Sequence, residues 1–371
     1  MRMMPITLCR PGMKLAKKIY SDDGLVLLAA GMELTATLIR RLAECGISFL
    51  YVQDPATDDI SIPELLTDET QRQAIRTVRS AFQSFVDQPV KRQTATYPYI
   101  GRDIRRVMNL IMEDLSRNDD AMIMLMNIQT VDHYLYSHSL NVCVYAAMLG
   151  LAMGYDRDRL MTLGTGSLLH DIGKTQISIQ VLLKPGMLTA YEFEEMKRHA
   201  ERGYYLLKDE PGIPLLAAHC AYQHHERLNG SGYPRGLKET EIHDYAKLIG
   251  IVDSYDAMTS RRAYRNAMLP HQAVEALYSG SGTLYDTTIL KFFRDKVAIY
   301  PIGITVKLST GQSAVVVGIN ASCAHRPIVR VIADEQGEPL RTPFDLDLSK
   351  HLNVLVSRVG IAEEHGDRLP V

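Results

Sequence analysis

The chain has 371 residues, of which 46% are hydrophobic, so it is long enough to bury a substantial core in two or three structural units. Its 41 basic and 43 acidic residues give a formal charge of −2, which argues against a surface for duplex nucleic acid or for an anionic membrane. The five cysteines are odd in number, widely spaced and form no CxxC pair, which disfavours a disulfide framework.

Two features of the sequence predict a soluble, cytoplasmic protein. The N-terminal stretch MRMMPITLCRPG lacks the apolar centre of a signal peptide. The longest apolar stretch, Val142 to Met153, is shorter than the roughly 18 to 20 residues that span a bilayer. We therefore expect no membrane segment.

Residues 1–60 are predicted to form a small α+β accessory unit. In KIYSDDGLVLL, Asp23 and Gly24 stand between two apolar runs, which indicates a β-hairpin. TATLIRRLAECGI then has helical spacing that ends at Gly46, and FLYVQ has strand character. Both a regulatory module and a packing cap stay open for this unit.

Residues 61–127 are predicted to form a helical connector. A first amphipathic helix spans residues 67–87 and a second begins at about Arg102. Their apolar stripes consist of Ile75, Val78, Phe82, Phe85 and Val86 in the first helix, and of Ile104, Val107, Met108, Ile111, Met112 and Leu115 in the second. Intramolecular packing fits these stripes better than a dimer seam, although a homodimer through the connector stays open.

The remaining sequence divides into a long helical block and a short β extension. Residues 128–300 show apolar helical patterns that polar residues repeatedly interrupt, so we expect the chemistry there. After Pro301, GITVKLSTGQSAVVVGIN and PIVRVIADEQG alternate like strands around turns that contain glycine. Residues 301–371 are therefore predicted to be a small β unit, and the whole chain to be mainly α.

The stretch GSLLHDIGK places His170 and Asp171 in an apolar run. An unpaired buried carboxylate is costly, so this doublet must be hydrogen-bonded, ion-paired or bound to a metal. Lys174 lies four residues after His170 and three after Asp171, which puts all three near one helical face. This set suits a metal-bound phosphate, whereas the adjacent Leu168 and Leu169 argue against a surface Asp–Lys pair.

The histidines concentrate around this doublet, and the seven between residues 133 and 225 are His133, His138, His170, His199, His219, His224 and His225. Taken alone, His138 fits a core position and His199 fits a solvated helix. The adjacent His224 and His225 precede a glycine-rich turn, and this arrangement favours a role as ligands. Position alone therefore leaves the first two histidines undecided.

Two carboxylates follow in KLIGIVDSYDAMTS. Asp253 comes after a mostly apolar run and Asp256 lies about one helical turn later, so we expect one to bind metal and the other to orient a ligand. Imidazole and carboxylate donors without thiolates suit divalent Mn, Fe or Zn. Three to six such ligands would hold two metal ions.

Together, these motifs resemble the HD-GYP subgroup of the HD metal-dependent phosphohydrolases. The motifs are HSLNV, LLHDIGK, HAERG, HHERLNGSGYPRGL and VDSYDAMTSRRAYR, and the resemblance runs from about His138 to Pro301. It implies that an all-helical HD-type bundle is the catalytic core, flanked by the small N-terminal α+β unit and the small C-terminal β unit.

The resemblance also implies a set of metal ligands. A first metal would be held by His138, His170, Asp171 and Asp253, and Asp171 would bridge to a second metal held by His199, His224 and His225. Two divalent ions, Fe(II) or Mn(II), are the implied cofactors.

The reaction implied by the resemblance is hydrolysis of cyclic di-GMP to linear pGpG and/or GMP. A hydroxide bridging the two metals would attack phosphorus and the 3′ oxygen would leave. Lys174 would bind the scissile phosphate beside Asp171. The residues implied in substrate contacts are Gly230, Gly232, Tyr233 and Pro234 in the glycine-rich loop, and Arg262 and Arg265 in the TSRRAYR run.

Two questions stay open at this level. Another cyclic dinucleotide, such as 3′,3′-cyclic GMP-AMP, is an alternative substrate, and a catalytically weak cyclic di-GMP-binding regulator is an alternative function. Some members of the family add a third metal through a glutamate four residues before the first histidine. Here that position is Tyr134, and Asp132 lies six residues before His138, so we expect two metals.

Overall fold

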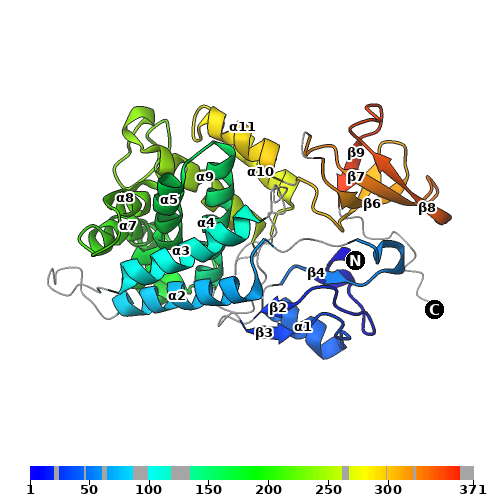
Figure 1. The fold of residues 1–371 in the computed structure, drawn as a ribbon, viewed down its shortest axis with the longest axis horizontal. Coiled ribbons are helices and arrows are strands. Elements are labelled where there is room, and N and C mark those ends of the chain that lie inside the picture. Colours follow the sequence, from blue (N-terminus) through cyan, green and yellow to red (C-terminus); the bar gives the residue numbers. More distant parts are fainter. Residues whose placement is uncertain are drawn as a thin grey trace. The chain divides into compact units, whose positions relative to one another are not determined.

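The computed structural model describes residues 1–20, 25–45, 47–60, 65–86, 99–117, 134–260, 267–297, 299–320 and 323–359. The chain forms two compact units. Unit 1 consists of residues 1–19, 27–63 and 298–371, and unit 2 of residues 20–26 and 64–297. Unit 2 is helical and unit 1 contains most of the strands, so the fold is mainly α as predicted (Figure 1).

The N-terminal part of unit 1 follows the predicted order of elements. Strand β1 (Arg2–Pro5) pairs antiparallel with β4 (Phe49–Val52), and helix α1 (Ala36–Glu44) precedes β4. Short 3-10 helices span Ile6–Leu8 (η1) and Pro55–Thr57 (η2). Strands β2 (Ile19–Tyr20) and β3 (Val26–Leu28) pair as the predicted hairpin requires, while Asp23, Gly24 and Gly46 lie outside the described residues.

The C-terminal segment forms the predicted β unit. Its five strands are β5 (Thr305–Leu308), β6 (Ser313–Gly318), β7 (Ile328–Ala333), β8 (Pro339–Asp347) and β9 (Val356–Val359). They form one antiparallel sheet in the order β8-β7-β6-β5-β9. Burial alternates along β7, where Val329 and Val331 are fully buried, whereas the consecutive residues Ala314, Val315 and Val316 of β6 are all buried.

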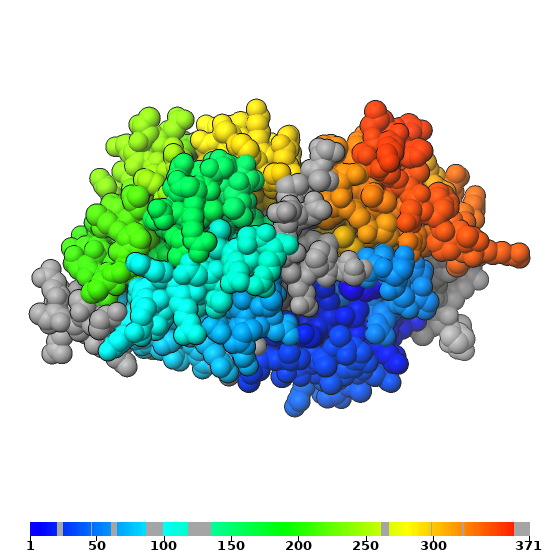
Figure 2. Space-filling view, viewed as in Figure 1, coloured from blue at the N-terminus to red at the C-terminus, as the bar shows by residue number. Residues whose placement is uncertain are grey.

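The two ends of the chain meet in unit 1, whereas the sequence predicts a separate unit at each end. The Met3 amide donates to the Gly303 carbonyl at 2.7 Å, and the Arg330 guanidinium donates to Asp59 at 2.6 Å. Figure 2 shows the blue N-terminal segment adjoining the orange β strands within this unit. The four-part division of the chain stays a prediction.

Unit 2 is built from helices in an almost uninterrupted series. Its α-helices are α2 (Asp68–Val86), α3 (Ile100–Ser116), α4 (Tyr134–Ala152), α5 (Arg157–Leu169), α6 (Ile179–Leu182), α7 (Ala190–Leu207), α8 (Leu215–Gln223), α9 (Asp244–Thr259), α10 (Pro270–Ser279) and α11 (Thr287–Lys296). Short 3-10 helices span Ile172–Gln176 (η3) and Glu239–Glu241 (η4). Side-chain caps fix the starts of α5 and α7, because Asp156 accepts from the Arg159 amide and Thr189 forms a capping box with Glu192.

Helices α2 and α3 belong to the same hydrophobic core as the rest of unit 2. Ile75 and Phe82 on α2, and Ile104 and Ile111 on α3, are each at most 1% exposed in this core. Burial of such side chains stabilises the fold by about 1.5–3 kcal/mol each, which is why the stripes pack inward. A homodimer through this segment would have to use the exposed sides of the two helices.

Helices α4 and α9 lie at the centre of unit 2. The window from Leu135 to Ala152 in α4 is long and apolar enough to cross a membrane, but 72% of it is buried inside the structure. A helix that is apolar on all sides is typical of the interior of a globular bundle. The central position of α4 and α9 places His138, Asp253 and Asp256 in the interior.

Candidate metal centre

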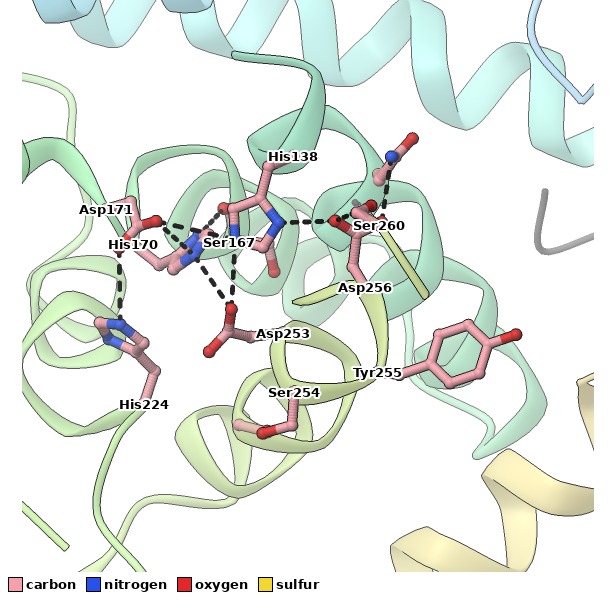
Figure 3. Close-up of polar contacts among 12 residues, drawn as sticks. His138, Ser167, His170, Asp171, His224, Asp253, Ser254, Tyr255, Asp256 and Ser260 are labelled. Atoms are coloured by element: carbon pink, nitrogen blue, oxygen red, sulfur yellow. Dashed lines mark hydrogen bonds and ion pairs between the residues drawn. The ribbon is translucent and has the colours of Figure 1, made fainter. Parts of the chain in front are cut away.

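Helices α4 and α9 bring His138 between two carboxylates (Figure 3). The Nδ1 atom of His138 lies 2.7 Å from Asp256 Oδ2, and Nε2 lies 3.1 Å from Asp253 Oδ1. The amide nitrogen of Asn141 donates to Asp256 Oδ1 at 3.0 Å. Asp256 thus orients the imidazole, and Nε2 faces Asp253 and Asp171, which is 3.7 Å away.

This environment changes the protonation of His138. Burial disfavours the imidazolium, but the hydrogen bonds and negative charges of Asp253 and Asp256 outweigh it and raise the pKa of His138 to about 9. Without metal, the ring is therefore protonated at neutral pH. A metal ion that binds Nε2 must displace this proton.

His170 and Asp171 lie where α5 ends and η3 begins. His170 Nδ1 lies 2.7 Å from the Ser167 carbonyl, which sets the direction of the ring, and Nε2 lies 3.4 Å from Asp171 Oδ2. Lys174 donates to the same Asp171 oxygen, so the predicted His-Asp-Lys cluster exists. Burial raises the pKa of Asp171, but Lys174 and His170 outweigh it and hold the pKa well below its usual range.

A second group of histidines faces the other oxygen of Asp171. His199 on α7 and His224 at the end of α8 have Nε2 atoms 3.3 Å apart, and these lie 3.4 and 3.8 Å from Asp171 Oδ1. His199 Nδ1 lies 2.7 Å from the carbonyl of Met196, and His224 Nδ1 lies 3.0 Å from that of Ala221. Each helix therefore orients its own histidine.

Burial dominates the electrostatics of this second group. It lowers the pKa of His199 to about 4 and the pKa values of His224 and His225 well below their usual range. The three rings are therefore neutral at physiological pH. Neutral imidazole is the form that binds metal.

The close approach of η3 to α7 depends on Gly173. A Cβ at this position would lie 2.0 Å from the His199 carbonyl oxygen and 2.5 Å from the Gly203 amide nitrogen. Neither backbone group could move without shifting α7. The glycine thus brings Asp171 within reach of the second group of histidines.

The donor atoms form two groups that share Asp171. The first consists of His138, His170 and Asp171, and the second of Asp171, His199, His224 and His225, and within each the donor atoms lie within 4.8 Å of one another. Asp253 reaches toward both groups, since its Oδ1 is near His138 and its Oδ2 is 3.8 Å from His225 Nδ1.

This donor set fits divalent metal ions. His170 Nε2 and Asp171 Oδ1 are buried and make no hydrogen bond to the described residues. Such atoms are costly unless something satisfies them, and a metal ion would do so. The arrangement matches the ligand set that the family resemblance implies, and the assignment of each ligand stays a prediction.

The predicted substrate loop lies beside the second group. A Cβ on Gly232 would lie 2.4 Å from the Arg227 amide nitrogen, so only glycine fits there. The buried Glu226 accepts from the amides of Arg235 and Leu237 at 2.8 and 2.9 Å. Gly230 has a positive φ of 80°, and Pro234 is exposed next to Tyr233.

Some predicted residues are not in the donor groups or are not described. His219 packs against the Tyr204 ring, with the ring centroids 5.1 Å apart. Arg262, Arg265, Asp132, His133 and the side chain of Tyr134 lie outside the described residues.

Sequence reasoning missed Asn141 and Glu226. Asn141 lies three residues after His138 and so shares its helical face, and Glu226 directly follows the histidine pair. The spacing of both residues could be seen in the sequence, but only the fold shows which groups the Asn141 amide and the Glu226 carboxylate contact.

Comparison with known protein families and relatives identifies the domain that contains this metal centre. Residues 121–289 match the HD domain family, and residues 305–367 match a KOW domain associated with the HD domain. The cyclic di-GMP phosphodiesterase PA4108 of Pseudomonas aeruginosa is 33% identical over 221 residues, which are 60% of this chain and 53% of that protein.

Two further relatives match over shorter lengths. A cyclic di-GMP phosphodiesterase of Thermotoga maritima is 47% identical over 126 residues, 34% of each chain. The 3′3′-cGAMP-specific phosphodiesterase 1 of Vibrio cholerae is 34% identical over 148 residues, 40% of this chain and 34% of that protein. The matches thus span from a third to about half of the length of these relatives.

The matched domain and the buried His/Asp centre define an HD domain, whose family is metal-dependent. Residues 121–289 thus form a domain of the HD family, and the cyclic di-GMP phosphodiesterases among the relatives agree with the HD-GYP resemblance of its motifs.

Proposed function

We propose that this chain is a metal-dependent phosphodiesterase that hydrolyses cyclic di-GMP to linear pGpG and/or GMP. The observation that carries the proposal is the pair of donor groups that share Asp171, with Lys174 beside it. The names of the relatives support cyclic di-GMP as the substrate.

The proposed ligands divide between two ions, for which Fe(II) or Mn(II) suits the nitrogen and oxygen donors. The first ion would be held by His138, His170, Asp171 and Asp253, and the second by Asp171, His199, His224 and His225. Divalent ions in such a site lower the pKa of water and neutralise charge on a phosphate.

Two further residues, Lys174 and Tyr233, would contact the substrate. The Lys174 ammonium is 17% exposed and has three donors, so it can pair with Asp171 and still donate to a phosphate oxygen. It would stabilise the negative charge that develops there during hydrolysis. Tyr233 lies over the second group and would contact the nucleotide as it enters.

Two alternatives define the limits of the proposal. The similarity to a cGAMP-specific enzyme favours 3′,3′-cyclic GMP-AMP as a second candidate substrate. A catalytically weak cyclic di-GMP-binding regulator is the non-enzymatic alternative, and the complete donor set argues against it. The five free cysteines fit the reducing cytoplasm, where we place the protein.

One experiment tests the proposal. The protein is purified without oxygen, its metal content is measured, and it is incubated with cyclic di-GMP and with 3′,3′-cyclic GMP-AMP. We expect two iron or manganese ions per chain and linear products on chromatography. Metal-loaded protein that leaves both dinucleotides intact would support the regulator instead.

The variant Lys174→Ala refines this test. We expect it to keep both metals and to lower turnover about 100-fold, since it removes a charged contact to the reacting phosphate. Loss of metal from this variant would instead assign Lys174 a structural role.

A further inference from the structure

A row of aromatic rings leads outward from the second donor group. The ring of Tyr233 lies 4.6 Å from that of His225 with an interplanar angle of 31°, and 6.4 Å from that of Phe193 at 81°. Phe193 is 47% exposed, so its ring is open to a ligand. The row therefore connects the metal centre with an open aromatic surface.

A cation lies over this row. Lys197 Nζ is 5.4 Å from the centroid of Phe193 and 5.9 Å from that of Tyr233. Its side chain is 26% exposed, and it pairs with Glu194 at 2.6 Å. Glu194 is 66% exposed and can turn toward a ligand without leaving the lysine.

Helix α7 fixes both parts of this arrangement. Phe193 and Lys197 are four residues apart, so they lie on one helical face, and His199 follows two residues later on the same helix. The capping box of Thr189 and Glu192 fixes the first turn of the helix, next to Phe193. The helix that supplies a metal donor thus also supplies the outer ring and the cation.

We infer that Phe193, Tyr233, Lys197 and Glu194 form a subsite for one guanine of the substrate, an inference that rests on the function proposed above. Aromatic rings stack on the faces of nucleobases, and this contact does not distinguish one base from another. The phosphate would lie at the metal centre beside Lys174. The base would then extend along the ring row.

The charged pair gives this subsite its selectivity. Guanine presents the acceptors O6 and N7 on one edge, where adenine presents N7 and an amino donor. The Lys197 ammonium can only donate, so it matches O6 of guanine and opposes the amino group of adenine. Glu194 can accept from the guanine N1–H, whereas adenine N1 is itself an acceptor.

The bland interpretation is that Lys197 and Glu194 form a surface ion pair at i,i+3 spacing, which contributes little. Lys208 offers a matched control at the end of the same helix. Its Nζ lies 5.3 Å from the Tyr205 ring and 3.6 Å from Asp209, so it has the same kinds of contact without the donor groups beside it.

The test compares Lys197→Met, Phe193→Ala and Lys208→Met as metal-loaded, full-length proteins. For each, kcat/KM is measured with cyclic di-GMP, with cyclic di-AMP, which offers no guanine, and with bis-nitrophenyl phosphate, which has no nucleobase. Metal content is measured in parallel to confirm that the centre is intact.

We expect Lys197→Met to lower kcat/KM for cyclic di-GMP about tenfold, to narrow the preference of the enzyme for cyclic di-GMP over cyclic di-AMP, and to leave kcat/KM for the small diester unchanged. Phe193→Ala should lower kcat/KM for both dinucleotides by the same factor, and Lys208→Met should leave kcat/KM for all three substrates unchanged. Equal effects of Lys197→Met on both dinucleotides, or on the small diester, would overturn the inference.

The failure of the proposed function has a different signature. If the wild-type protein cleaves neither dinucleotide, calorimetric binding of the two still tests the subsite. Weaker binding of cyclic di-GMP alone to Lys197→Met would support it, and unchanged binding would refute it.

Discussion

The two donor groups share Asp171, but His138 of the first group is held in a different way from the histidines of the second. In the first group Asp256 orients His138, and Asp253 and Asp256 together raise the pKa of His138 to about 9. In the second group backbone carbonyls orient His199 and His224, and burial keeps them neutral. The first group must therefore release a proton from His138 when a metal ion binds, whereas the histidines of the second group are already neutral and can bind an ion directly.

The largest effect should come from the residue that the groups share. We expect Asp171→Asn to lose both metal ions and to lower kcat at least about 1000-fold, because the carboxylate that belongs to both groups would lose its charge. Metal analysis and product chromatography measure this. Asp209→Asn, at an exposed carboxylate just beyond α7, is the control, and two retained ions in Asp171→Asn would disprove the bridging role.

A smaller and one-sided effect is expected from Asp256→Asn. This change removes the carboxylate that orients His138, so affinity for one ion should fall about 10- to 100-fold while the other ion stays bound. Metal titration of the variant separates the two sites. An equal loss at both sites would break the distinction between the groups.

The smallest change per step, at most about tenfold per pH unit, is the pH dependence of metal binding. Because the pKa of His138 is raised, its proton stabilises the metal-free fold fully below about pH 6.5, and that contribution is lost as the pH rises through about 9. The same deprotonation frees Nε2, so affinity of the first group should rise up to about tenfold per pH unit between pH 7 and 9.

The second group should show no such dependence in this range. Its histidines are already neutral, with a pKa of about 4 for His199. Calorimetry in two buffers of different ionisation enthalpy should therefore detect about one proton released by one ion and none by the other. Release of equal numbers of protons by both ions would contradict the comparison.

The sequence was informative where a periodic pattern or a dense motif carried the signal. The apolar stripes of α2 and α3 and the alternation of β5 to β7 predicted elements that the structure confirms. The sequence predicted that one of Asp253 and Asp256 binds metal and that the other, about one helical turn away, orients a ligand. Only the fold shows that Asp256 is the one that faces His138 Nδ1.

What the sequence could not provide was contact between distant segments. Phe193 meets Tyr233 forty residues later because α7 and the glycine-rich loop both approach the second group. Likewise, Met3 pairs with Gly303 across most of the chain, and neither segment has a local pattern that names its partner. Tertiary packing determines such pairs.

Because both ends of the chain contribute to unit 1, vectorial synthesis imposes an order on folding. The ribosome completes residues 64–297 before it makes residues 298–371 of unit 1, so unit 2 can fold while unit 1 still lacks its five-stranded sheet. Contacts of high sequence separation also form slowly, since closing a long loop costs entropy. The HD domain should therefore form its metal-binding core before unit 1 can fold completely, although the N-terminal residues of unit 1 are synthesised first.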